Sequence, residues 1–309
     1  MYMYLPIALT SVNYLVVMGL GLAVGLLSGL FGVGGGFLMT PLLMMIGIPP
    51  TIAAATDANQ IVAASASGTF SHWRLGNVDF KMGLYLLIGG FVGGAAGVQV
   101  IKILRATGGA DFMIKMTYVI MLGGVGSFMF VESLNAMRKT KKAPVASAPA
   151  AKPKEKKGGF FAALPMQTYF EKSGVTHSAL VPLFLGTFVG VLAAIMGVGG
   201  GFLMVPVMIY MLRMPMHVVV GTSLFQILFT CIEVTYLQAY SNHTVDFMLA
   251  ILLLIGSVFG AQIGTALGKK LHGDQLKILL SIIVLAVTVK IVLELVMEPS
   301  ILLSYAGGH

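Results

Sequence analysis

Two copies of one glycine-rich motif could form a binding site, because three consecutive glycines interrupt a long apolar run in each. The first copy, residues 32–41, reads GVGGGFLMTP, and the second, residues 197–206, differs only by Val205 in place of Thr40. Glycine inside a helix costs about 1 kcal/mol relative to alanine. In a bilayer, irregular backbone survives only where protein buries it or a cavity adjoins it. The duplicated break therefore predicts a binding site.

A short apolar segment follows each motif, and its first N–H groups have no partner within their own helix. These N–H groups and the positive end of the helix dipole favour an anion. The alternative is a tight turn in which the glycines serve packing alone. The motif residues predicted to bind substrate are Gly34, Gly35, Gly36, Phe37, Gly199, Gly200, Gly201 and Phe202.

Polar side chains occupy matching places in the next segment of each half. Thr56 and Gln60 are four residues apart, as are Thr222 and Gln226, so each pair shares one helix face. Hydroxyl and amide groups suit an oxyanion, whereas the alternative is interhelical hydrogen bonding worth about 0.6 kcal/mol on average. The polar residues predicted to bind substrate are Thr56, Asn59, Gln60, Thr222, Ser223 and Gln226.

Asp57 stands where the second half has Ser223. A carboxylate within a membrane span is a functional candidate, and we interpret Asp57 as a candidate for proton coupling. The alternative is a solvated acid near a helix N-terminus, where the helix dipole favours it.

Other chemistries lack their motifs. Phe37 and Phe202 stand where a phosphate-binding loop needs Lys-Ser/Thr and where a dinucleotide fingerprint needs a third glycine. No two of the six histidines are three or four residues apart, and no nucleophile arrangement is evident. We therefore expect no enzymatic activity, no metal site and no cofactor.

The composition is that of a polytopic membrane protein: 57% hydrophobic and 10% charged residues, with a mean hydropathy of +0.94. The net charge of +8 comes almost entirely from residues 138–157, which hold eight basic residues and one acid. A basic groove for nucleic acid is therefore not expected. The single cysteine, Cys231, excludes an internal disulfide.

The apolar pattern predicts an all-α membrane protein of two homologous repeats, with about 8–10 transmembrane segments. The segment at 37–48 covers roughly 18 Å, too short for a hydrocarbon core of about 30 Å. Glycines four residues apart, beginning at Gly89 and Gly256, predict close helix packing. The predicted segments are 13–33, 37–48, 51–70, 80–104 and 112–134, then 179–197, 202–212, 216–240, 247–271 and 275–303.

We divide the chain into a first repeat (1–137), a basic linker (138–175) and a second repeat (176–309). Residues 143–159 are rich in Ala, Pro and Lys, which is typical of a flexible linker. Residues 160–173 are either an interfacial segment or an ordinary loop.

The basic linker is expected on the cytoplasmic side. Five crossings per half then place the N-terminus outside and invert the second repeat relative to the first. Lys102, Arg105 and Lys115 fall on the outer side, against the positive-inside rule. If the short segments do not cross, each half has four crossings and the repeats are parallel.

The sequence resembles the TauE/SafE family of membrane transporters, often called sulfite exporters, in three features. These are the glycine motif with its proline, Gly221-Thr222-Ser223, and Val-Asp before a Gly-xxx-Gly helix in both halves. The resemblance covers almost the whole chain outside the linker. It implies a secondary transporter for small anions, typically sulfite or sulfonates, in a bacterial inner membrane. The chain departs from the pattern at Ala55-Thr56-Asp57, where the added acid favours proton linkage.

We therefore predict export or exchange of a small anion, with the lipid bilayer and that anion as partners and homo-oligomerisation left open. The alternatives are a permease for carboxylates or other small solutes, a membrane scaffold without transport activity, and a channel.

Overall fold

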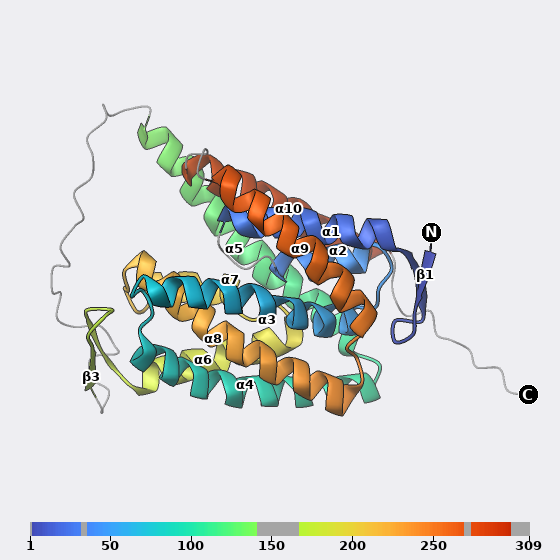
Figure 1. Ribbon diagram of the computed structural model, residues 1–309, viewed down its shortest axis with the longest axis horizontal. Helices are drawn as coiled ribbons and strands as arrows, with labels where there is room; N and C mark the ends of the chain where they lie inside the picture. The colour runs from blue at the N-terminus through green and yellow to red at the C-terminus, as the bar shows by residue number, and fades with distance from the viewer. Residues whose placement is uncertain (1, 32–35, 141–166, 269–272, 298–309) are drawn as a thin grey trace, which may run out of the picture.

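The computed structural model describes residues 2–31, 36–140, 167–268 and 273–297 of the 309-residue chain. Within these residues the chain is mostly helical, and helices from its two ends lie side by side. Figure 1 shows α1 next to α9 and α10 at the top of the view, and α4 next to α6 and α8 at the bottom.

The helices follow the predicted apolar segments closely. In the first half they are α1 (Tyr14–Phe31), α2 (Gly36–Met45), α3 (Pro50–Arg74), α4 (Phe80–Ala106) and α5 (Ala110–Thr140). In the second half they are α6 (Leu180–Met196), α7 (Gly201–Tyr210), α8 (Met216–Leu237), η2 (Gln238–Asn242), α9 (Phe247–Gly268) and α10 (Gly273–Met297).

Glycine and proline residues account for the end of α2 and for the turns on either side of α3. α2 ends at Met45, ahead of the predicted 48, because Gly47 adopts a left-handed φ of 90° and Pro49-Pro50 follow. α3 continues to Arg74, past the predicted 70, and the chain turns at Gly76, where φ is 73°.

The prediction of an all-α chain was wrong for two short β-hairpins. Strands β1 (Tyr2–Leu5) and β2 (Thr10–Asn13) pair antiparallel directly before α1. Strands β3 (Gln167–Phe170) and β4 (Val175–Ser178) pair in the same way just before α6. For residues 160–173 the sequence favoured an interfacial segment or an ordinary loop. Four-residue strands of mixed polarity are too short to show a clear alternation.

Each hairpin is held in place by one large buried side chain of its own and by one aspartate of the other half. Leu5 and Phe170, which end β1 and β3, are completely buried. The Ile7 N–H donates to the Asp246 carboxylate at 3.2 Å, and the Ser173 N–H donates to the Asp79 carboxylate at 3.2 Å. The two hairpins therefore join the halves at two separate loops.

The glycine ladders allow helices of opposite halves to pack with their backbones almost in contact. A side chain on Gly89 or Gly93 of α4 would meet the backbone of Leu183 or Thr187 in α6. In the same way, Gly260 of α9 lies against the carbonyl of Leu22 in α1. This is the close approach that small residues permit between membrane helices.

The order of the contacts gives the helix directions. α4 and α6 run parallel, because Gly89 lies against Leu183 and Gly97 against Val191. α4 and α8 are also parallel, since Gly83 lies against Phe225 and Gly94 against Glu233. α6 and α8 therefore point the same way, and the segment that contains α7 must return the chain between them.

α3 and α8 run antiparallel, as do α5 and α10. Gly68 of α3 lies against Leu224 of α8, and further along α3 His72 lies against Gly221. Gly123 and Gly126 of α5 lie against Thr288 and Val284 of α10. The two helices of each pair come from corresponding places in the two halves of the chain.

Within the described residues, three helices are long and apolar enough to cross a membrane by length and composition: Phe80–Ala106, His217–Asn242 and Phe247–Gly264. The helices Tyr14–Ser28, Gly36–Met45 and Leu180–Met196 are apolar but shorter. Phe80, Phe184, Phe247 and Phe259 expose apolar rings, as lipid-facing side chains do. These features are those of a multi-pass membrane protein.

Candidate functional site

The second glycine motif forms a hinge between α6 and α7 that depends on left-handed backbone. Gly197, Gly199 and Gly200 have φ values of 71°, 67° and 75°. The Gly197 N–H donates to the Ala193 carbonyl and closes α6, while Gly200 precedes α7. Residues other than glycine rarely adopt this conformation. The glycines here set the backbone path.

The first motif is described only in part. Gly34 and Gly35 lie outside the described residues, and Gly36 begins α2, as Gly201 begins α7. A side chain at Gly36 would meet Ile61 and approach Asp57, both on α3. Both helices therefore start in buried surroundings, and a larger residue at Gly36 would have to displace the Ile61 side chain.

Phe37 and Phe202 bring the two short helices together. Their rings stack with centroids 4.9 Å apart and planes inclined by 15°, and both side chains are buried. Each is the second residue of its helix, so the stack joins the first turn of α2 to the first turn of α7. Two helix N-termini, which the sequence separates widely, meet at one place.

A proline follows each stacked phenylalanine by four residues. Pro41 lies inside α2 and Pro206 inside α7. Proline has no N–H and cannot donate to the carbonyl four residues before it. The carbonyls of Phe37 and Phe202 therefore lack their usual helical donors, which adds two polar groups to the apolar junction.

Two isoleucines and the cysteine pack against the hinge from α3 and α8. A side chain at Gly199 would meet Cys231, Ile227 and Ile61, all of which are buried. Beside the hinge, an apolar space bordered by Met196, Val198 and other residues is too tight to hold a water molecule. The hinge is tightly packed in this conformation.

Asp57 is completely buried close to the start of α2. Its Oδ2 accepts a hydrogen bond of 2.9 Å from the Thr40 hydroxyl, and its Oδ1 has no partner among the described residues. The corresponding Ser223 donates to the Val220 carbonyl of its own helix. The acid and the threonine thus distinguish the first motif from the second, which has Val205 in place of Thr40.

Two of the three predicted amides are buried. Gln60 and Gln226 are buried, and Oε1 of each lacks a partner among the described residues. Nε2 of Gln226 donates to the Thr230 hydroxyl at 3.0 Å. Asn59 is half-buried. Unpaired buried polar groups are uncommon in native proteins, so these oxygens are candidate ligand contacts.

The two predicted threonines hold loops of the opposite half. The Thr56 hydroxyl accepts from the Asp246 N–H at 3.1 Å, and the Thr222 hydroxyl accepts from the Asp79 N–H at 3.0 Å. Each aspartate also caps the helix that follows it, since Asp79 accepts from the Met82 N–H and Asp246 accepts from the Leu249 N–H. Both threonines therefore have a structural role here.

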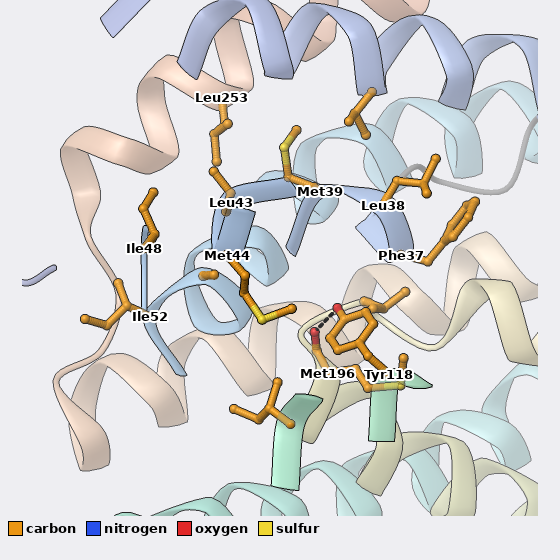
Figure 2. Packing of buried hydrophobic residues seen from close by; sticks show 14 of the residues in the cluster. Phe37, Leu38, Met39, Leu43, Met44, Ile48, Ile52, Tyr118, Met196 and Leu253 are labelled. Carbon is orange, nitrogen blue, oxygen red and sulfur yellow. Dashed lines mark hydrogen bonds between the residues drawn. The ribbon is translucent and has the colours of Figure 1, made fainter. Parts of the chain in front are cut away.

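Tyr118 on α5 is a site residue that sequence reasoning missed. Its ring is completely buried, and its hydroxyl donates to the Met196 carbonyl at 2.5 Å, directly before the second motif. Figure 2 shows this bond beneath α2, with Phe37 and Met44 on the same side. A tyrosine within an apolar run carries no spacing signal, although buried Tyr hydroxyls usually find a partner.

Arg105, one of the three basic residues that do not follow the positive-inside rule, has a hydrogen-bond partner in the second half. Its guanidinium donates to the Asn242 carbonyl at the end of η2, at 2.5 Å. This bond gives a donor to a carbonyl at a helix end, which has no partner within its own helix. Arg105 therefore has a structural role that does not depend on which side of the membrane it faces.

Comparison with known proteins bears on the whole chain. The family model described as "Sulfite exporter TauE/SafE" matches residues 17–291. The chain is 26% identical to the "Probable membrane transporter protein YunE" of Bacillus subtilis, over 91% of this chain and 98% of that protein. It is 28% identical to "Probable membrane transporter protein YjnA" of the same organism, over 88% and 97%.

A shorter match relates the chain to a plant protein. The "Sulfite exporter TauE/SafE family protein 3" of Arabidopsis thaliana is 31% identical over 34% of this chain and 24% of that protein. No solved structure matches the chain.

Proposed function

Because the chain belongs to the TauE/SafE family of membrane transporters, we propose that it is a secondary transporter that binds a small anion between its two glycine motifs. The observation that carries this proposal is the stack of Phe37 on Phe202. It brings the N-terminal turns of α2 and α7 together in a buried region, where free N–H groups and the dipole ends favour an anion.

The proposed architecture is two inverted repeats. α3 and α8 are antiparallel, α5 and α10 are antiparallel, and α4 runs parallel to α6 and α8. The two antiparallel pairs, α3 with α8 and α5 with α10, support inversion, because each joins corresponding helices of the two halves. In such transporters, discontinuous helices at the repeat interface bind the substrate, and one repeat moves against the other.

The proposed substrate is sulfite or a sulfonate, exported across a bacterial inner membrane. The family description supports this class, and the relative from Arabidopsis carries "sulfite exporter" in its name. Proton linkage is supported by Asp57. An ionised carboxyl buried at this place would repel the anion, whereas a carboxyl that carries a proton would not.

A ligand screen on the purified full-length protein tests the proposal. Thermal unfolding is followed with sulfite, thiosulfate, methanesulfonate and acetate at two pH values. We expect a sulfur oxyanion to stabilise the native state, by about 2.7 kcal/mol at one hundred times its Kd. Uptake of the same anion into proteoliposomes then establishes transport.

Gly199→Ala should abolish both responses, because the new methyl group meets Ile227 and Cys231. Gly76→Ala is the matched control: it also has a left-handed φ, 73°, but nothing lies within 4 Å of its added atom. A response to acetate alone would favour a carboxylate permease. Absence of any response and any flux would favour a scaffold, and electrical currents far above transporter rates would favour a channel.

A further inference from the structure

Tyr118 connects the first motif's distinctive pair with the backbone of the second motif. Its hydroxyl donates to the Met196 carbonyl, the last of α6. The Thr40 side chain and the Asp57 carboxyl both interact electrostatically with this hydroxyl. Thr40, in turn, donates to Asp57. One buried hydroxyl thus lies between elements of both halves.

The direction of the hydrogen bonds in this group depends on Asp57. When Asp57 is ionised, its Oδ2 can only accept, so the Thr40 hydroxyl donates to it. When Asp57 carries a proton on Oδ2, that oxygen becomes the donor and the Thr40 hydroxyl turns its hydrogen toward Tyr118. All the bonds then point from Asp57 to Met196, and aligned hydrogen bonds strengthen one another.

We propose that Tyr118 is a positioning residue that couples the Thr40–Asp57 pair to the second glycine hinge through its bond to the Met196 carbonyl. The inference rests on the proposed function, in that the second hinge lines the anion site. A proton on Asp57 tightens the bond to Met196 and fixes the end of α6. An ionised Asp57 loosens it, so the same proton that favours the anion also orders the hinge.

Among the described residues of the second half, no equivalent of this group is present. Val205 and Ser223 stand where the first half has Thr40 and Asp57, and Ser223 bonds its own helix. The titratable groups that face Asp57 in the described residues are Tyr118 on α5 and Cys231 on α8. Both are buried and neither is a cation. Asp57 is therefore the group whose charge can set the direction of the hydrogen bonds between Asp57 and Met196.

Three variants of the full-length protein test the coupling: Tyr118→Phe, Thr40→Val and their double. Valine is the residue that the second motif has at this position. Unfolding temperatures are measured across pH, with Asp57→Asn as the background in which the charge is absent. Tyr118→Phe should lower the unfolding temperature by about 2–4 °C at low pH, and by less at high pH. The double variant should lose less than the sum of the two single variants, because both act on one group of hydrogen bonds.

Thr117→Val is the control, because this neighbour on α5 loses a hydroxyl that bonds its own helix at Met113. Its effect should not vary with pH. The inference is overturned if Tyr118→Phe has the same effect at every pH, if its effect adds fully to that of Thr40→Val, or if the pH dependence of its effect persists unchanged in Asp57→Asn. These readouts do not need transport, whereas failure of the proposed function appears as a wild-type protein that no anion stabilises.

Discussion

Thr56 and Thr222 illustrate how one side chain can satisfy both a structural and a functional expectation. Their spacing to Gln60 and Gln226 predicted a ligand-binding face, and both glutamines retain a buried Oε1 without a partner in the described residues. The threonine hydroxyls instead accept backbone N–H groups from the loops before α9 and α4. A hydroxyl that accepts can still donate, so an anion contact stays a prediction.

Thr56→Val and Thr222→Val should each destabilise the protein by about 1–3 kcal/mol, because each leaves a buried N–H without an acceptor. Thermal unfolding measures the loss. Thr288→Val is the control, since that hydroxyl bonds its own helix at Val284, and it should cost less. If either threonine variant keeps the wild-type stability but no longer responds to sulfite, its hydroxyl belongs to the ligand and not to the loop.

α4 and α6 pack closely through glycine residues and not through large apolar side chains. In α4, the faces of Gly89, Gly93 and Gly97 lie against α6. The apolar sequence predicted the helix and its small-residue face. It did not predict the partner, since α4 packs on α6 of the other half across the linker and not only on its own neighbours.

Gly93→Ala should lower stability by about 1–3 kcal/mol, the range expected for overpacking, because the added methyl group meets the Thr187 carbonyl. Gly124→Ala in α5 provides the contrast. Nothing lies within 4 Å of its added atom, so it should be neutral or gain up to about 1 kcal/mol from helix propensity. Equal effects of the two variants on the unfolding temperature would contradict the packing seen between α4 and α6.

The two β-hairpins offer a direct measure of how the halves are oriented in the membrane. Each begins its half and is held by an aspartate of the other. Their exposed turns include Pro6 in the first hairpin and Glu171 in the second, at corresponding places. Inverted repeats put these turns on opposite sides of the membrane, whereas parallel repeats put them on the same side.

Single cysteines at Pro6→Cys and Glu171→Cys, in a background with Cys231→Ser, test this in intact cells with a membrane-impermeant maleimide. We expect labelling from outside at residue 6, and labelling at residue 171 only after the cells are opened. The protein without these changes, whose only cysteine is the buried Cys231, serves as the unreactive reference. Labelling of both positions from the same side would exclude the inverted arrangement.

The sequence by itself determined the membrane class, the approximate helix bounds and the duplicated motif, because these depend on local composition and on residues close together in the chain. Gly47 and Pro50 in the first half, and Gly197 and Gly200 in the second, end or start helices wherever the rest of the protein lies. Asp57 was also visible, since a carboxyl in an apolar segment is unusual wherever it packs.

Only the tertiary structure decided which groups meet. Phe37 stacks on Phe202, Tyr118 bonds Met196, and Thr56 bonds Asp246. Each contact joins residues far apart in the chain, and the choice of partner depends on the directions and packing of several helices at once. For that reason the facing of the two glycine motifs was a prediction from their repetition, while the hydrogen bonds that surround them could be seen only in the folded protein.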